Sequence, residues 1–291
     1  MQNLIRSIRA HLNMSQQELA EYLGVAFATV NRWENGRSVP NKLAQDKILE
    51  LCREKVVPVY DMILQKIEAV ANAVVPEPGR ILLYHGSKSG IQGQIEPKSR
   101  RRCDFGQGFY MGTEPTQGLT LICDYEQSKF YIVSVDVKEL TQLEIQPDID
   151  WAMMVAYHRG KMETIKDTPF YNKYRDMAEG RDLIVGSIAN DRMFYVIDNF
   201  FVGGITDAAL VNCLSALQLG KQYVAVTQKA CDAVRIETEI ALSYLERHII
   251  KAIAEDNRAR GVSLANDICK NYRREGLFFD EILDEAKAGG V

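Results

Sequence analysis

Two short motifs in the middle of the chain combine side chains and main-chain groups that suit a flat, polar ligand. The first, His85-Gly86-Ser87, follows an apolar segment at 80–84 that is typical of a buried strand. An imidazole gives a directional hydrogen bond, glycine exposes the main-chain N–H and C=O at close range, and a tyrosine ring offers a stacking face with a polar tip. The imidazole and glycine belong to the first motif, and the tyrosine ends the second motif, the run Asp104-Phe105-Gly106-Gln107-Gly108-Phe109-Tyr110. The two motifs together predict a binding pocket.

The segments around these motifs predict a sheet with helices packed on it. β-Branched and aromatic residues mark strands at 80–84, 130–137, 182–188 and 222–227. Helical spacing of apolar residues marks helices at 114–123, 151–159, 170–175, 192–201 and 207–217. This irregular alternation indicates an α+β domain. It does not support a Rossmann fold, because no G-x-G-x-x-G sequence opens a helix after a strand.

The first 73 residues predict an all-α module. Ser15 and Glu18 form a capping box at the start of one helix, and Gly24 provides a left-handed C-cap at its end. The next helix covers 28–34 and stops at Asn35-Gly36. Two short helices joined by a tight turn that contains glycine can insert the second, recognition helix into the major groove of DNA.

The segment SQQELAEYLGVAFATVNRWENGRSVP closely resembles the helix-turn-helix of phage-repressor-like transcriptional regulators. Residues 1–56 carry eight basic and six acidic side chains, an excess opposite in sign to the net charge of −4 of the whole chain. We therefore expect residues 1–56 to bind DNA; the alternative is a docking or dimerisation module. By match to the family, the side chains expected to face DNA are Gln17, Thr29, Asn31, Arg32 and Arg37. Those expected in the core are Leu19, Ala20, Val25, Val30 and Trp33.

The run Val75-Pro76-Glu77-Pro78-Gly79 marks the clearest boundary in the chain, because two prolines and a glycine end a helix and make a stiff linker. The sequence thus predicts a multidomain protein. Its expected parts are a helix-turn-helix domain with a supporting helix at 1–73, a linker at 74–79, the pocket domain at 80–236 and a helical extension at 237–291. Within the extension we expect helices at 238–257, 264–272 and 277–286, with Gly261 ending the first.

The motifs of the second domain together resemble the bacterial domain of unknown function 3990, a family placed in the ADP-ribosyltransferase superfamily. The first two motifs also resemble the NAD pocket of diphtheria-toxin-like and poly(ADP-ribose) polymerase-like transferases. The resemblance implies an ADP-ribosyltransferase-like α+β fold and NAD as a substrate. In chain order the motifs are Tyr84-His85-Gly86-Ser87, the run from Asp104 to Tyr110, the run DLIVGSIANDR at 182–192, and Gln222-Tyr223.

The same resemblance implies roles for single residues. His85 would bond the adenine-proximal ribose, the main chain of Gly86 would clamp the nicotinamide amide, and Tyr110 would stack on the nicotinamide ring. The loop from Ser99 to Gly108 would cover the cofactor, and its arginines at 100–102 could meet the pyrophosphate, because arginine suits phosphate geometry. The other residues implied at the cofactor are Ser87, Asp104, Phe105, Gly106, Gly108 and Phe109.

Gln222 departs from the pattern of the well-understood transferases, which have a glutamate at this position. Glutamine can accept a hydrogen bond from the ribose, but it brings no negative charge to the cation that forms as nicotinamide leaves. Catalysis by His85, Tyr110 and Gln222 is then slower, or Asp104 or Asp191 supplies the carboxylate, or the site binds NAD without turnover.

Composition sets the remaining expectations. The six cysteines include no C-x-x-C pair, so we expect neither a metal site nor a disulfide framework, and we infer a reducing compartment. The N-terminus lacks the apolar core of a signal peptide, and no apolar run approaches the roughly 20 residues that span a membrane. These features predict a cytoplasmic protein without a membrane partner.

The leading hypothesis is a bacterial DNA-binding protein that transfers ADP-ribose from NAD to a macromolecular acceptor, as a toxin or defence factor. The rival is a transcriptional regulator whose second domain senses NAD or another nucleotide without chemistry. A third reading treats both domains as interaction modules. A helical segment at 58–75 could also support a homodimer.

Overall fold

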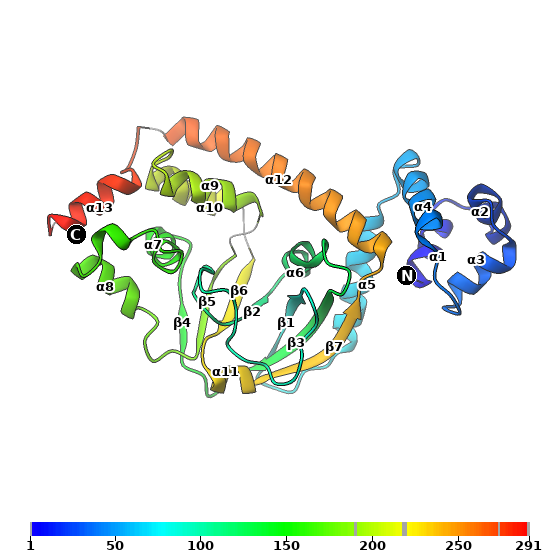
Figure 1. Cartoon of the computed structure of the whole chain (residues 1–291), viewed down its shortest axis with the longest axis horizontal. Helices are drawn as coiled ribbons and strands as arrows, with labels where there is room; N and C mark the ends of the chain where they lie inside the picture. Colours follow the sequence, from blue (N-terminus) through cyan, green and yellow to red (C-terminus); the bar gives the residue numbers. More distant parts are fainter. Residues whose placement is uncertain (1, 189–190, 217–219, 273, 290–291) are drawn as a thin grey trace.

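The structure is a computed structural model that describes residues 2–188, 191–216, 220–272 and 274–289. Figure 1 shows an N-terminal group of helices, a mixed sheet covered by helices, and a long helix that runs over those helices and ends beside the N-terminal group. The expected combination of a helical N-terminal part, an α+β domain and C-terminal helices is confirmed. None of the described helices has the length and apolar content needed to cross a bilayer.

The helices are α1 (Gln2–His11), α2 (Gln16–Leu23), α3 (Phe27–Glu34), α4 (Lys42–Glu54), α5 (Val59–Ala73), α6 (Pro115–Ile122), α7 (Ile149–His158), α8 (Pro169–Asp176), α9 (Asp191–Phe201), α10 (Asp207–Ala216), α11 (Gln228–Asp232), α12 (Tyr244–Tyr272) and α13 (Phe279–Lys287). A 3-10 turn covers Glu163–Ile165. The strands are β1 (Arg80–Ser87), β2 (Phe109–Gly112), β3 (Lys129–Asp136), β4 (Gln142–Glu144), β5 (Leu183–Ser187), β6 (Lys221–Ala225) and β7 (Val234–Ala241).

The sheet is almost divided between β1 and β2. Its strand order is β4-β5-β6-β2-β1-β3-β7. β2 pairs with β6 along its whole length, and β1 pairs likewise with β3. β1 and β2, however, pair at a single position, Tyr84 with Gly112. The strands therefore form two well-paired halves that meet at one point.

The two faces of the sheet are covered differently, because successive side chains of a strand point to opposite sides. Ile91 and Ile95 of the segment between β1 and β2 pack over Phe109 and Met111, so we call this side the loop face. α7, α9 and α10 pack over the other side, the helix face, which carries Ile184 and Val224 and, partly buried, Tyr110.

The helix-turn-helix module shares its hydrophobic core with the second domain. Ile63 and Ile67 of α5 belong to the same buried cluster as Leu119 of α6 and Leu245 of α12. Polar contacts also join the two parts: the Leu245 N–H donates to Gln45 Oε1 at 3.0 Å. The proline-containing segment between α5 and β1 is also held, since Arg235 Nη1 and Glu77 Oε1 lie 3.0 Å apart.

The C-terminal helices differ from the sequence prediction. The helix expected at 238–257 begins only at Tyr244, because residues 234–241 pair with β3 as β7. It also does not end at Gly261 but runs on to Tyr272. A glycine costs about 1 kcal/mol in a helix interior, and the packing of α12 against α9 and α10 outweighs that cost.

Candidate functional site

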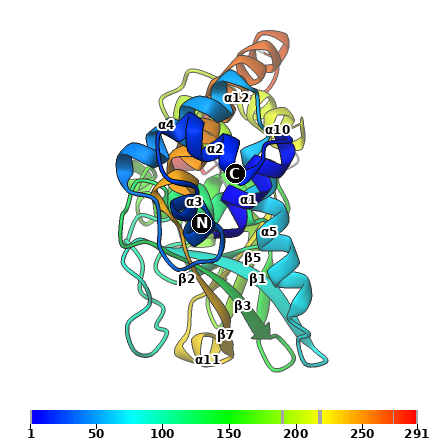
Figure 2. The same cartoon turned by 90° about the vertical axis from the view of Figure 1, so that its right-hand side faces the viewer.

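The two helices that were expected to contact DNA have the geometry of a helix-turn-helix. The capping box of Ser15 and Glu18 is formed at the start of α2. Gly24 has a φ of 69°, the left-handed conformation that turns the chain from α2 towards α3. α2 and α3 lie at the end of the molecule farthest from the C-terminus, and α3 is at the front when this end is viewed directly (Figures 1 and 2). The rest of the chain leaves this end open.

Three of the side chains expected to face DNA are exposed: Gln17, Arg32 and Arg37. Thr29 and Asn31 are half-buried, and both bond within the module. Arg32 Nη2 donates to Thr29 Oγ1 at 3.3 Å, and Asn31 Nδ2 donates to a glutamine of α2 at 3.2 Å. The expected core residues are buried except Val25, which packs against the core while half-buried.

Phe27 is a further candidate DNA contact, which the sequence pattern placed in the turn before the recognition helix. It is instead the first residue of α3, and 48% of it is exposed. N-terminal residues of a recognition helix contact base edges, and an apolar ring can pack on a thymine methyl group.

A buried ion pair fixes the end of α3. The Glu34 side chain is fully buried, and Arg9 Nε of α1 donates to Glu34 Oε1 at 2.6 Å. Gln16 Nε2 of α2 donates to Glu34 Oε2 at 2.7 Å. Burial acts to raise the pKa of the Glu34 carboxyl, but the bonds from Arg9 and Gln16 outweigh it and hold the pKa below its usual value. Glu34 thus ties three helices together.

The second candidate site lies where β1 and β2 separate. One residue beyond the single strand pair, the imidazole of His85 bridges the gap, with Nδ1 lying 2.7 Å from the main-chain oxygen of Tyr110. A carbonyl oxygen only accepts, so Nδ1 carries the proton and Nε2 keeps its lone pair. Burial lowers the pKa of His85, which keeps the ring neutral at pH 7. This histidine therefore presents one hydrogen-bond acceptor at the split.

The rings of His85 and Tyr110 lie on opposite faces of the sheet. His85 stacks on Phe109 with ring centroids 4.2 Å apart, and Phe109 belongs to the loop face. Tyr110, the next residue, packs on the helix face. Its Oη donates to the carbonyl of Gly106 at 2.8 Å and accepts from the N–H of Phe105 at 3.1 Å. The aromatic partner of His85 is thus Phe109, and the Tyr110 hydroxyl anchors the loop.

Gln222 lies on the helix face, one diagonal step from Tyr110. Its residue partners across the sheet are both glycines, Gly112 on β2 and Gly186 on β5. The side chain is only 2% exposed, and its Nε2 donates to the main-chain oxygen of Ser187 at 3.1 Å. The structure therefore brings Gln222 and Tyr110 to one face and leaves His85 on the other.

The candidate carboxylates do not join Gln222. Asp104 Oδ1 accepts from Nη2 of Arg159, the residue after α7, at 2.7 Å. This pair is nearly buried and holds the loop on the helix face. The side chain of Asp191, like Asn190, lies outside the described part of the chain.

The remaining motif residues have local roles in packing. Phe105 is buried, with its ring over Gly186. Gly86 faces α6: a Cβ built on it would overlap the carbonyl oxygen of Gly118. Gly108 likewise faces Val224. Ser87 is half-buried at the end of β1.

A polar cleft of about 540 Å³ opens beside this loop. Phe105 and Gly106 line it together with Arg101, the only one of the three consecutive arginines among its lining residues. His158 at the end of α7 also lines the cleft, and its Nε2 is buried without a hydrogen-bond partner. Burial lowers the pKa of His158 to about 4. The cleft therefore contains a neutral histidine and an exposed guanidinium.

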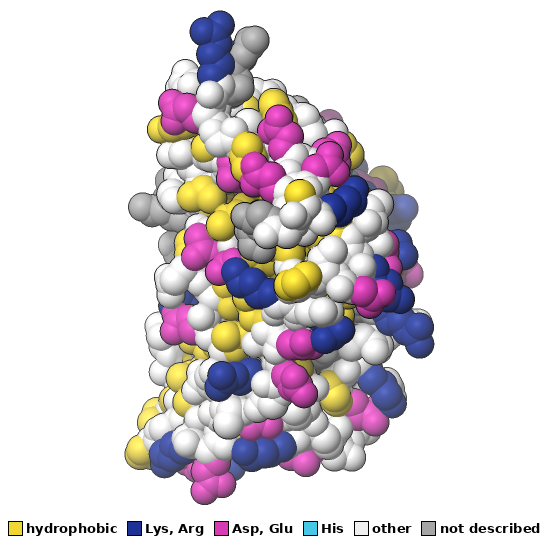
Figure 3. Space-filling view, turned by 90° about the vertical axis from the view of Figure 1, so that its left-hand side faces the viewer, with side chains coloured by type: hydrophobic (Ala, Val, Ile, Leu, Met, Phe, Trp, Pro, Cys, Tyr) yellow, Lys and Arg dark blue, Asp and Glu magenta, His cyan; other side chains and the backbone are white. Residues whose placement is uncertain are grey.

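The opposite end of the molecule carries charges of both signs. Figure 3 shows acidic and basic side chains interspersed over the end that carries α8 and α13. Several of these charges are paired, as in the bonds between Arg175 and Asp176 and between Lys287 and Asp284. The end that carries α2 and α3 remains the candidate for DNA.

Comparison with known families gives two matches. The family described as "Protein of unknown function (DUF3990)" matches residues 81–236, and the family described as "Helix-turn-helix" matches residues 5–54. No curated protein and no solved structure gives a significant match. The helix-turn-helix match suggests DNA binding. Because the first match covers more than half of the 291 residues, the chain belongs to the DUF3990 family and carries a helix-turn-helix domain before its family domain.

Proposed function

We propose that this chain is a DNA-binding protein whose second domain binds NAD at the split between β1 and β2 and transfers ADP-ribose to a macromolecular acceptor. The observation that carries the proposal is the bond between His85 Nδ1 and the Tyr110 carbonyl. It leaves Nε2 as an acceptor for a ribose hydroxyl at the point where the sheet opens. Membership of the ADP-ribosyltransferase superfamily, which the motifs imply, is part of the proposal.

In this proposal the chain acts by positioning. His85 accepts from the adenine-proximal ribose, and the loop that Tyr110 anchors covers the dinucleotide. Arg101 at the cleft supplies charge for the pyrophosphate, because a guanidinium can bond two phosphate oxygens at once. For Tyr110 to stack on nicotinamide, its bonds to Phe105 and Gly106 must break as the loop moves. NAD binding is therefore coupled to the loop.

A second candidate function, sensing of NAD without turnover, is favoured by the state of Gln222. Its amide nitrogen is bonded to Ser187, and Asp104 is engaged by Arg159. Neither supplies a free negative charge to the nicotinamide ribose. Stabilisation of a developing cation by preorganised charge is worth a few kcal/mol, so its loss slows or stops transfer while binding remains.

One experiment separates these functions. Full-length protein is mixed with adenine-labelled NAD and cell lysate, and both label transfer and free nicotinamide are counted. We expect His85→Ala to abolish the signal and His11→Ala, an exposed histidine of the first domain, to leave it unchanged. No turnover, together with NAD-dependent thermal stabilisation that His85→Ala removes, establishes the sensor. If the protein shows neither turnover nor NAD-dependent stabilisation, both the transferase and the sensor proposals are wrong.

DNA binding is tested separately, by fluorescence anisotropy on a pool of random duplexes. We expect Arg32→Ala to weaken DNA binding roughly tenfold, as for a lost phosphate or base contact. The slope of log affinity against log salt concentration should also fall in magnitude by about one, which corresponds to one fewer released counterion. The matched control is Arg274→Ala, an exposed arginine beyond α12. Equal affinity of both variants would remove α3 from the DNA interface.

A further inference from the structure

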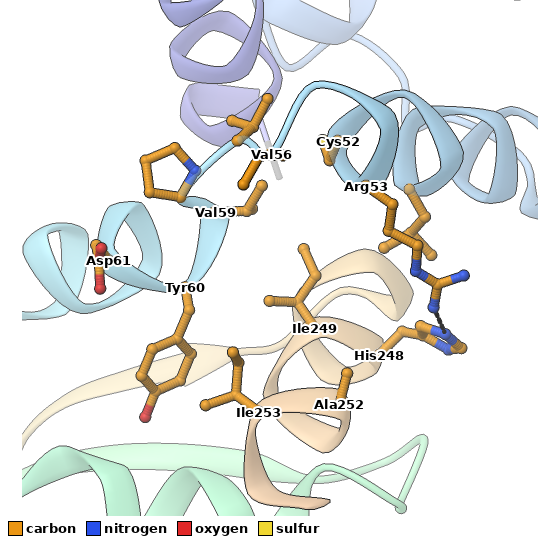
Figure 4. Close-up of a pocket in the computed structure, with 13 residues that line it drawn as sticks. Cys52, Arg53, Val56, Val59, Tyr60, Asp61, His248, Ile249, Ala252 and Ile253 are labelled. Atoms are coloured by element: carbon orange, nitrogen blue, oxygen red, sulfur yellow. Dashed lines mark hydrogen bonds between the residues drawn. The ribbon is translucent and has the colours of Figure 1, made fainter. Parts of the chain in front are cut away.

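The joint between the helix-turn-helix module and α12 contains an apolar cavity that neither the DNA nor the NAD proposal uses. Its volume is about 410 Å³, within the range of small-molecule sites. The walls come from three segments that are far apart in the sequence: the end of α4, the turn into α5 and the first turns of α12 (Figure 4). Any occupant touches both parts of the protein.

The body of the cavity is aliphatic. Its walls include Val56, Val57, Val59, Ile249, Ala252 and Ile253. Figure 4 shows the side chains of Val59, Ile249 and Ile253 around the same space. Val56 at the mouth has a φ of 52°, which a β-branched residue rarely adopts, and 84% of it is exposed. An exposed apolar side chain is therefore held at the entrance of the cavity.

The polar groups lie at opposite ends of this apolar body. At one end, Arg53 Nη2 lies 3.1 Å from His248 Nε2. Arginine only donates, so Nε2 of His248 accepts this bond, and the remaining guanidinium N–H groups stay available. Among the described residues, this is the one hydrogen bond that the Arg53 side chain makes. At the other end stands the exposed Asp61.

We propose that this cavity binds a small carboxylate with an unbranched aliphatic body, of the medium-chain fatty acid class. The carboxylate bonds the Arg53 guanidinium, whose planar donors match two carboxylate oxygens. The aliphatic chain lies along Ile249 towards Ile253. Asp61 repels a carboxylate, so its charge fixes which end of the ligand enters which end of the cavity. A cationic amphiphile of the same length would have to enter in the reverse direction, with its ammonium group at Asp61 and without a bond to Arg53.

The test is calorimetry of the full-length protein with sodium decanoate and with decylamine, each below its micelle concentration. We expect decanoate to bind through Arg53, and any binding of decylamine to be independent of Arg53. Arg53→Gln should lower the affinity for decanoate about tenfold or more, because a hydrogen bond to a charged group is lost. Ala252→Trp should fill the cavity and abolish binding. The matched control is Ala259→Trp, an exposed position about two turns further along α12.

Three results would overturn the proposal. Equal loss of affinity for both amphiphiles in Arg53→Gln would show an apolar site without carboxylate recognition, and an unchanged affinity for decanoate in this variant would place its head group elsewhere. No binding of decanoate by the intact protein would remove the site. Thermal melts of both tryptophan variants check that each is folded. None of these measurements involves NAD or DNA, so failure here leaves the proposed function standing.

Discussion

Gln222 and Trp151 donate hydrogen bonds to one acceptor, the main-chain oxygen of Ser187, at 3.1 and 3.2 Å. The shared carbonyl fixes which way the Gln222 amide points, because only its nitrogen can donate. The amide oxygen therefore faces away from Ser187. Trp151 is fully buried in the core of the helix face, so this arrangement joins the candidate site to that core.

We predict that restoring the glutamate of the transferase pattern, by Gln222→Glu, destabilises the protein. An ionised carboxylate at this buried position would lose the donor and face a carbonyl oxygen, so the glutamate must be protonated to keep the bond. Its pKa in the fold then exceeds its unfolded value, and stability present at low pH is lost as the pH rises through that range. We expect a loss of about 2–4 kcal/mol at pH 7.5 and less at pH 4.5, measured by urea unfolding. Gln107→Glu, at an exposed loop position, is the control. Equal losses at both pH values would contradict this.

The pKa of His158, lowered by burial to about 4 from the ordinary 6.5, predicts a pH effect on stability. A histidine with a depressed pKa contributes stability that is present above pH 6.5 and lost as the pH falls towards 4. Between pH 7 and pH 5 this amounts to about 2 kcal/mol. His85 acts in the same direction, so the test compares variants: His158→Phe should lose less stability over this interval than the parent protein. His11→Gln should lose as much as the parent. An unchanged slope in His158→Phe would show that this ring titrates normally.

Gly86→Ala should lower the stability of the fold rather than impair a ligand contact. The added methyl group would overlap the main chain of α6 at Gly118, which cannot give way as a side chain can. Overpacking costs typically 1–3 kcal/mol, and we expect the upper end of that range in thermal or urea unfolding. Gly93→Ala is the control, since its Cβ would meet no atom within 4 Å although its φ of 72° adds some strain. If Gly86→Ala melts like the parent, α6 is more adaptable than this contact implies.

Glu34→Gln should destabilise the helix-turn-helix module by about 3 kcal/mol, because it removes one partner of a buried ion pair. Arg9 then keeps its charge beside an amide, and α1, α2 and α3 lose their common contact. Hydrogen exchange of α3 amides measures the effect locally. Glu50→Gln on the exposed side of α4 should change little. Equal protection of α3 in both variants would show that the apolar core alone holds the module.

The sequence was most informative where local chemistry decides the structure. The capping box at Ser15, the turn at Gly24 and the stop after Glu34 depend on neighbouring residues, and the helices formed as expected. Hydrogen-bonded pairing between strands and tertiary packing determine the elements that the sequence did not predict. β7 could have been recognised, since its apolar residues alternate with charged ones. β2 could not, because a strand of four residues with Gly112 at its end exists through its pairing with β6.

The relation of the site residues was also beyond the sequence. His85 and Tyr110 each carry a suitable group, yet strand alternation turns their rings to opposite faces. That outcome depends on the register between β1 and β2, which no local signal specifies. The engagement of Asp104 by Arg159 is likewise a contact between distant segments. Their roles towards NAD stay predictions.

The long helix α12 determines how far the second domain can reach. At 1.5 Å per residue, its 29 residues span roughly 40 Å, from α4 and α5 at one end to α9 and α10. A domain on a flexible tether would sample a sphere around its binding site on DNA. Here α12 holds the second domain in one orientation relative to the helix-turn-helix module. On a DNA duplex, the split between β1 and β2 would therefore face one direction at a fixed distance from the bound site. Under the proposed function, acceptors beside the bound DNA site would be met at high local concentration, and those a few helical turns away would be out of reach.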